Sequence, residues 1–154
     1  MRRRALLVLA SMMLGVMMLG GVALAKNITG TSGSDDPEGT KRADKIRGLE
    51  GRDYIAGKGG SDDLYGGRGK DEVRGANGRD FIDGGHGSDH LYGGGKNDWL
   101  KAVDGERDRV NCGSGNDDKA YVDKIDRVNE NCEDVKKYDD HKDYDHKHDD
   151  HKDY

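Results

Sequence analysis

The chain has 154 residues, of which 37% are charged and only 32% are hydrophobic, and its mean hydropathy is −1.02. This length and composition predict one small domain with tails and exclude a conventional hydrophobic core of useful size. The formal net charge of −5 disfavours nucleic acid as a partner and favours cations.

Residues 1–25 have the pattern of a secretory signal peptide. Three arginines at 2–4 precede an apolar run over 5–22, and the Ala-Leu-Ala at 23–25 is a typical cleavage site. The mature chain is therefore expected to start at Lys26, to be secreted, and to have no membrane association after cleavage. An uncleaved membrane anchor is the alternative, because the apolar run is nearly long enough to span a bilayer.

Residues 26–47 contain imperfect copies of a nine-residue unit that becomes regular further along. The unit GTSGSDDPE keeps Asp35 but has Pro37 where an aliphatic residue is expected, and the unit GTKRADKIR keeps Asp44 and Ile46. Degenerate first repeats are typical of a cap, whose outer face must remain exposed to solvent.

Residues 48–101 consist of six consecutive nonapeptides, GLEGRDYIA, GKGGSDDLY, GGRGKDEVR, GANGRDFID, GGHGSDHLY and GGGKNDWLK. Each begins with glycine, has Asp at its sixth position and has a branched aliphatic residue at its eighth. The aspartates are Asp53, Asp62, Asp71, Asp80, Asp89 and Asp98, and the aliphatic residues are Ile55, Leu64, Val73, Ile82, Leu91 and Leu100.

The residue types explain what one unit can do. Glycines permit a tight turn with positive φ, and such a turn can direct several carbonyl oxygens at one point, where the aspartate adds a carboxylate. Oxygen ligands in a flexible arrangement suit Ca2+ better than Mg2+. The last three residues are expected to form a short strand with one inward side chain, and only stacked units can build a core from such residues.

These units resemble the haemolysin-type calcium-binding repeats of the RTX family. The resemblance implies an all-β fold, a right-handed parallel β-roll or β-solenoid, in which two nonapeptides make one coil of about 18 residues. It also implies that Ca2+ lies between turns stacked on the same edge, with weaker sites in the degenerate units. The implied ligands are Asp53, Asp71 and Asp89 on one edge, Asp62, Asp80 and Asp98 on the other, and Asp35 and Asp44 in the cap.

Two aromatic residues stand at outward strand positions one coil apart. Phe81 and Trp99 are expected to lie side by side on the surface. Cross-strand packing is one explanation of the pair. A small aromatic platform for a glycan or another molecule is the other.

Residues 102–135 continue the pattern in weaker form after a slip of one residue at Ala102. This register places Lys119 inward and predicts a C-terminal cap with decaying calcium sites. The candidate ligands are Asp104, Asp108 and Asp117, with Asp126 a weaker one.

Cys112 and Cys132 are separated by 20 residues, close to one coil of the implied fold. They are expected to lie on neighbouring coils and to form a disulfide in an exported chain. Closing such a loop would stabilise the fold by roughly 3 kcal/mol.

Residues 136–154 are of low complexity, with the hexapeptide DDHKDY occurring twice. The absence of an apolar period predicts a disordered tail. Its histidines, His141, His146, His148 and His151, could also bind transition metals weakly.

No catalytic motif is recognisable, so an enzyme is not expected. The favoured function is a secreted calcium-binding repeat protein that folds on binding several Ca2+ ions. The alternative is an extracellular adhesion or matrix protein that uses the β-roll as a scaffold for glycan or cell-surface contacts.

Overall fold

The computed structural model describes residues 24–139, and the regular structure in this range is entirely β-strand. The predicted signal peptide, apart from its last two residues, and the predicted tail from residue 140 onward lie outside the described residues. The strands are β1 (Asn27–Thr29), β2 (Lys45–Glu50), β3 (Tyr54–Gly59), β4 (Asp63–Arg68), β5 (Glu72–Asn77), β6 (Phe81–His86), β7 (His90–Gly95), β8 (Trp99–Ala102), β9 (Arg109–Ser114), β10 (Lys119–Asp123), β11 (Arg127–Val128) and β12 (Asp134–Tyr138).

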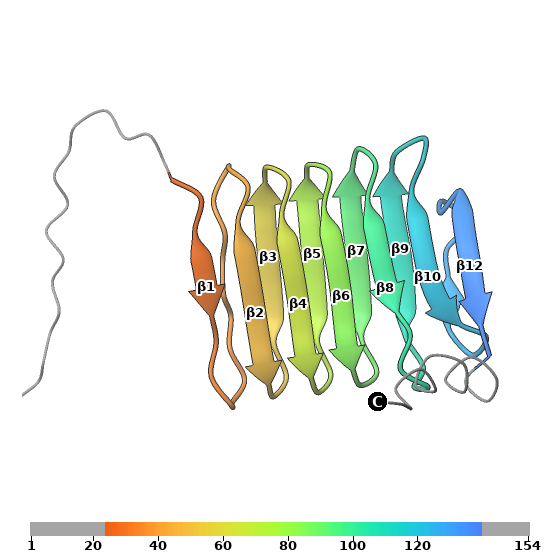
Figure 1. Cartoon of the computed structure of the whole chain (residues 1–154), viewed down its shortest axis with the longest axis horizontal. Helices are drawn as coiled ribbons and strands as arrows, with labels where there is room; N and C mark the ends of the chain where they lie inside the picture. Colours follow the sequence, from red (N-terminus) through yellow and green to blue (C-terminus); the bar gives the residue numbers. More distant parts are fainter. Residues whose placement is uncertain (1–23, 140–154) are drawn as a thin grey trace, which may run out of the picture.

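From β2 onward, successive strands alternate between two parallel sheets (Figure 1). One sheet has the order β1-β2-β4-β6-β8-β10-β12, and the other has the order β11-β9-β7-β5-β3. In the regular region the paired residues are 18 apart, as in Ile46 with Leu64 and Leu64 with Ile82. Two nonapeptides therefore make one coil, and the predicted parallel β-solenoid is confirmed.

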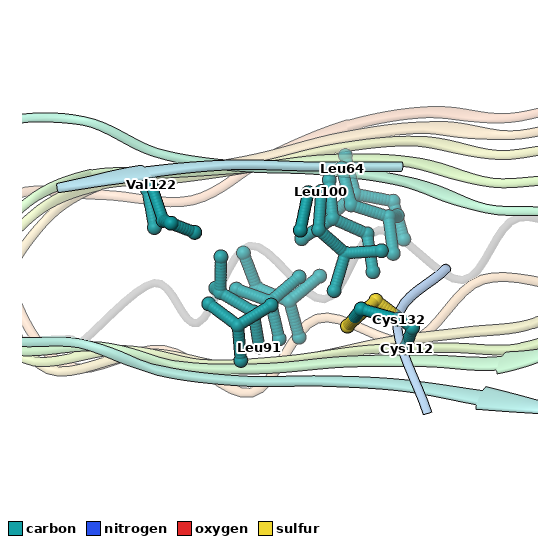
Figure 2. Packing of buried hydrophobic residues seen from close by; sticks show 13 residues of the cluster. Leu64, Leu91, Leu100, Cys112, Val122 and Cys132 are labelled. Atoms are coloured by element: carbon teal, nitrogen blue, oxygen red, sulfur yellow. A yellow bond between two sulfur atoms is a disulfide. The ribbon is translucent and has the colours of Figure 1, made fainter. Parts of the chain in front are cut away.

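A narrow core fills the space between the two sheets (Figure 2). The aliphatic residue at the eighth position of each regular unit is fully buried, and these side chains stack along the solenoid. Leu64 and Leu100 project from the seven-stranded sheet, and Leu91 projects from the five-stranded sheet toward them. Each coil thus contributes two inward aliphatic residues, which is why no coil can form a core without its neighbours.

The strands of the regular coils are longer than the three residues expected from the sequence. Strand β3, for example, begins with Tyr54 at the seventh position of one unit and ends with Gly59 at the third position of the next. The first glycine of a unit, such as Gly57, is buried within a strand rather than in a turn. The turn itself is therefore confined to the fourth, fifth and sixth positions.

Two positions of the unit adopt positive φ. The second position does so at Gly67, Gly85 and Gly94, and the fourth at Gly51, Gly60, Gly69 and Gly87. Non-glycine residues occupy such positions in four places, at Leu49 (φ 87°), Lys58 (φ 76°), Ala76 (φ 78°) and Lys96 (φ 75°). A residue with a Cβ is strained in this region, so these four places cost the fold stability.

Three strand pairings in the C-terminal coils depart from the offset of 18, and the sequence predicted the cause of only the first. His90 pairs with Arg109, an offset of 19, and this is the predicted slip. Trp99 pairs with Lys119, an offset of 20, because the turn before β10 holds one further residue. The assignment of Lys119 as the inward residue is therefore wrong, and the inward residue of this strand is the fully buried Ala120. The third departure is the pairing of Lys119 with Asp134, an offset of 15.

The solenoid ends in β12, which pairs with β10 over residues 134–138. The predicted tail thus begins too early, since residues 136–138 belong to the sheet. The predicted disulfide is present between Cys112 in β9 and Cys132 before β12, with a Cα–Cα distance of 5.2 Å. It appears at one side of the core in Figure 2. No helix within residues 24–139 has the length and apolarity to cross a membrane.

Candidate metal sites in the turns

The turn aspartates form two ladders, one along each edge of the solenoid. The first edge, at the bottom of Figure 1, holds the turns that lead from the seven-stranded to the five-stranded sheet. The second edge holds the turns that lead back. The first-edge ladder is Asp35, Asp53, Asp71, Asp89, Asp108 and Asp126, and the second-edge ladder is Asp44, Asp62, Asp80, Asp98 and Asp118.

One hydrogen bond connects each pair of neighbours in a ladder. The Oδ1 of each aspartate accepts the backbone N–H of the aspartate one coil earlier, as between Asp71 and Asp53 at 2.8 Å. This bond fixes every carboxylate in the same orientation. It also places like charges on successive coils, about 5 Å apart, the usual spacing of paired strands.

The second oxygen of the central aspartates is buried without a hydrogen-bond donor. Within residues 24–139 this holds for the Oδ2 of Asp53, Asp62, Asp71, Asp80, Asp89, Asp98 and Asp118. An ionised oxygen buried in this way is costly unless it is paired with a positive charge. The regular repetition of the unpaired oxygen indicates a positive partner at each turn.

At most of these turns the first glycine of the unit lies close to both the unpaired carboxylate oxygen and a main-chain oxygen. A Cβ built on Gly48 would be 2.2 Å from Asp53 Oδ2 and 2.5 Å from the carbonyl oxygen of Gly66 on the next coil. On the other edge, a Cβ on Gly57 would be 2.4 Å from Asp62 Oδ2. Glycine is therefore required at the first position, and carboxylate and carbonyl oxygens gather there as a hard cation requires.

Burial raises the pKa of the central aspartates far above the usual range of a carboxyl group. The pKa of Asp62, Asp89 and Asp98 is raised to about 7, and neighbouring charges in the same ladder add to the effect of burial. Burial likewise raises the pKa of Asp71 and Asp80 to about 6. Burial thus favours the protonated or metal-bound form of these carboxylates over the free ionised form.

The two aspartates of the N-terminal cap differ from the central ones. Asp35 Oδ2 accepts hydrogen bonds from the N–H and the hydroxyl of Thr31, at 2.6 and 2.9 Å. Asp44 Oδ2 accepts the N–H of Thr40 at 2.5 Å. Burial raises the pKa of Asp44, but hydrogen bonds from the N–H groups of Lys26 and Thr40 outweigh it and leave the pKa below its usual value. Both predicted ligands are in the ladders, but the Oδ2 of each already accepts a hydrogen bond.

Two candidate ligands, Asp104 and Asp117, do not lie in a ladder. Asp117 is exposed, and its neighbour Asp118, which is fully buried, accepts the N–H of Asp98 in its place at 2.7 Å. The cause is the second register slip, which the sequence analysis did not detect. Asp108 is placed as predicted, and its Oδ1 accepts the N–H of Asp89.

No three His, Cys, Asp or Glu side chains between residues 24 and 139 are arranged around a common point that could hold a metal ion. This agrees with the ladder geometry, since each turn contributes one carboxylate. A cation at a turn would therefore take its remaining ligands from main-chain carbonyl groups.

A line of aromatic rings crosses the outer face of the seven-stranded sheet. Its members are Tyr65, Phe81, Trp99, Tyr121 and Tyr138, with successive ring centroids 5.8, 5.8, 5.4 and 6.2 Å apart. We call it the aromatic line. The expected contact of Phe81 with Trp99 is present. The sequence analysis expected contact between Phe81 and Trp99 alone, because Tyr65 is outward at the ninth position and Tyr121 and Tyr138 follow the register slips.

Comparison with known proteins identifies the repeat. The family model of the RTX calcium-binding nonapeptide repeat, which spans four copies, matches residues 29–64, 38–73 and 65–100. No curated protein and no solved structure matches the chain. The matched region forms the regular coils of the solenoid described above. Residues 29–100 of the chain are thus RTX calcium-binding nonapeptide repeats, and they form a parallel β-solenoid.

Proposed function

We propose that this protein is secreted and that its solenoid folds as it binds several Ca2+ ions between stacked turns. The observation that carries the proposal is the row of buried, unpaired carboxylate oxygens along both edges. The match of residues 29–100 to a calcium-binding repeat supports the choice of cation. The proposal assigns binding to the chain and no catalytic reaction.

The ions would be held by the aspartates with an unpaired Oδ2, together with main-chain carbonyl groups of the turns. These are Asp53, Asp62, Asp71, Asp80, Asp89, Asp98 and Asp118. In each, the hydrogen bond to Oδ1 orients the carboxylate, and the first glycine of the unit allows the chain to approach it closely. The bound ion would supply positive charge between carboxylates that otherwise repel each other.

Calcium binding and folding are coupled in this proposal. Each coil buries only two aliphatic side chains, and it also buries two carboxylates. Hydrophobic burial alone therefore has to offset both the ordering of a glycine-rich chain and the confinement of like charges. Binding of the ion removes the second cost, so its free energy becomes folding free energy.

Calcium titration of the purified protein tests the proposal. Calorimetry should give several ions per chain, and circular dichroism should show strand content that appears with calcium and disappears in excess chelator. A strand spectrum that is the same in chelator and in millimolar calcium would contradict the coupling. Absence of calcium binding heat at any concentration would contradict the proposal as a whole.

Export fits both the sequence and the expected strength of the sites. The signal-peptide pattern of residues 1–25 would direct the chain outside the cell. Extracellular calcium modules typically bind with dissociation constants of about 10⁻⁴ to 10⁻³ M, so the outside medium would fill the sites. Sequencing of the protein recovered from the culture medium should find Lys26 at the amino terminus, and retention of residues 1–25 in a membrane fraction would contradict export.

The aromatic line supports a second candidate function, extracellular adhesion. Trp99 is 48% exposed, and a shallow groove beside it is lined by Phe81 and second-edge residues that include Asp62, Asp80 and Asp98. Exposed aromatic rings beside polar groups are suited to sugar rings, which have apolar faces and hydroxyl rims. The surface would then bind glycans while the ions hold the scaffold.

Pull-down on insoluble polysaccharides tests adhesion with matched variants. Trp99→Ala should abolish retention, whereas Tyr54→Ala should not, because Tyr54 is exposed to a similar degree but lies on the five-stranded sheet. Equal retention of both variants would exclude the aromatic line as the glycan surface.

A further inference from the structure

A third set of acidic groups lies at the first edge, apart from the sixth-position aspartates of the repeats. Asp123 ends β10, and Asp104 lies in the turn between β8 and β9. The residues that pair in the earlier coils put Leu49, Gly67 and Gly85 at the position of Asp123. An acid at this position is therefore foreign to the repeat, and it stands beyond residue 100, where the family match ends.

Asp123 connects two turns of neighbouring coils. Its Oδ2 accepts the backbone N–H groups of Asp104 and Gly105, at 2.9 and 2.7 Å. Its own N–H donates to Asp126 Oδ2 at 2.7 Å. These bonds hold the turn after β8 against the turn after β10.

The other carboxylate oxygen of Asp123 has no partner. The residue is fully buried, and its Oδ1 receives no hydrogen bond from any group in residues 24–139. A carboxylate that is wholly removed from water normally has both oxygens satisfied. This oxygen therefore requires a donor or a cation.

The surroundings of Asp123 are negative. Burial raises the pKa of Asp126, and the charges of Asp123 and Asp104 raise it further. None of the ion pairs within the described range involves Asp104, Asp123 or Asp126. Within the described residues, no basic side chain therefore forms an ion pair with any of these three carboxylates.

We propose that Asp123, which lies next to Asp104 and to the ladder residue Asp126, binds an additional Ca2+ ion through a carboxylate outside the nonapeptide pattern. The available ligands are carboxylate and main-chain oxygens, which suit a hard cation rather than a transition metal. Both oxygens of Asp104 and of Asp126 already accept main-chain N–H groups, so these two residues contribute negative charge, and Asp123 Oδ1 is the carboxylate oxygen that takes the ion. The ion closes the C-terminal end of the solenoid on the first edge. The inference stands independently of calcium binding by the repeats.

Calorimetric stoichiometry of three full-length proteins gives the first test. Asp123→Asn keeps an oxygen that can accept the N–H groups of Asp104 and Gly105, but it removes the charge. It should bind one Ca2+ fewer than wild type. Asp36→Asn, which removes an exposed charge outside both ladders, should bind the wild-type number. A wild-type stoichiometry for Asp123→Asn would overturn the inference.

A second measurement does not depend on the folding of a variant. Wild-type crystals grown with terbium(III) in place of Ca2+ should show an anomalous-difference peak beside Asp123 Oδ1. Peaks at the repeat turns with none at Asp123 would overturn this inference and leave the proposed function intact. A peak at Asp123 with none at the repeats would support this inference and contradict the proposed function.

Discussion

The backbone N–H of Asp62 donates to the carboxylate of Asp80, on the next coil, at 2.9 Å. The residue that contributes one carboxylate thus also positions the next one. Replacement of the aspartate at one turn should consequently alter the position of the chain at the turn one coil before it. The ladders make the candidate calcium sites a connected row rather than independent pockets.

Removal of one central carboxylate tests this connection. Asp80→Asn should lose one bound ion and weaken binding at the neighbouring second-edge turns, with a lower calcium sensitivity of folding as a result. The midpoint of folding against calcium concentration, followed by circular dichroism, measures the effect. Asp36→Asn serves as the charge control. A midpoint for Asp80→Asn equal to that of this control would contradict a role for Asp80 in binding.

Gly75 should tolerate no side chain. A Cβ at this position would lie 2.4 Å from Asp80 Oδ2 and 2.6 Å from the Gly93 carbonyl oxygen. We expect Gly75→Ala to destabilise the calcium-loaded protein by about 3 kcal/mol, at the upper end of overpacking costs, because both oxygens belong to the turn framework. Chemical denaturation in saturating calcium measures this.

Gly33→Ala is the matched control, because its Cβ would meet only the hydroxyl of Thr31 at 3.7 Å. A change in stability of similar size in both variants would show that the loss reflects glycine replacement in general and not the crowded oxygens.

Acid should partly replace calcium. The pKa of Asp89 and Asp98 is raised by burial to about 7 in the metal-free fold, whereas an unfolded aspartate titrates near 4. The folded state then binds protons more tightly, so metal-free stability is greatest below about pH 4 and falls as pH rises toward 7. Circular dichroism in chelator should show more strand at pH 5 than at pH 8. Equal or lower strand content at pH 5 would contradict the claim that these carboxylates are buried in the calcium-free fold.

Glycine should stabilise the protein at the strained second position of one unit. Ala76 is exposed and has φ 78°, so its Cβ gains no packing and is held in an unfavourable conformation. We expect Ala76→Gly to raise the free energy of unfolding by about 0.5–1 kcal/mol. Glycine removes the strain of the left-handed backbone from the folded state, and the greater entropy of the unfolded chain offsets part of this gain. Thermal unfolding in calcium measures it. Ala56→Gly, at a position without positive φ, should lower stability instead, and a loss in both variants would contradict the strain.

Periodicity explains why most of the fold could be predicted from the sequence. Aspartate at the sixth position and an aliphatic residue at the eighth recur without a gap, and stacking such units has one solution that buries every aliphatic residue. The two ladders follow directly, because alternate units meet on the same edge. The six central aspartates thus lie where the pattern predicted them.

The errors arose where local sequence was ambiguous. At Asp117 and Asp118 two adjacent acids can each close the turn, and the choice depends on which following residue faces inward. The ladder register chosen from the glycines placed Lys119 in the core, whereas the structure places Ala120 there. Burying the methyl group of an alanine costs less free energy than burying the ammonium group of a lysine. A comparison of these two costs could have revealed the second slip.

Asp123 could not be found by any periodic argument, because it stands out of step with the repeat. Its importance depends on burial and on an unpaired oxygen, neither of which the sequence displays. The strand lengths were missed for a related reason. Glycine is usually a sign of a turn, but at the first position, as in Gly57, it is a strand residue that lies against a carboxylate.

The alternation of units between the two sheets restricts how such a gene can change in length. Insertion or deletion of 18 residues adds or removes a whole coil and leaves each remaining segment on its original side, as the pairing offset of Leu64 with Ile82 shows. Gain or loss of a single nonapeptide would instead transfer all downstream segments to the opposite side. This transfer would separate or displace the two partners of the disulfide between Cys112 and Cys132. It would also divide the aromatic line between the two sheets. Natural length variants of this protein should therefore differ by even numbers of units.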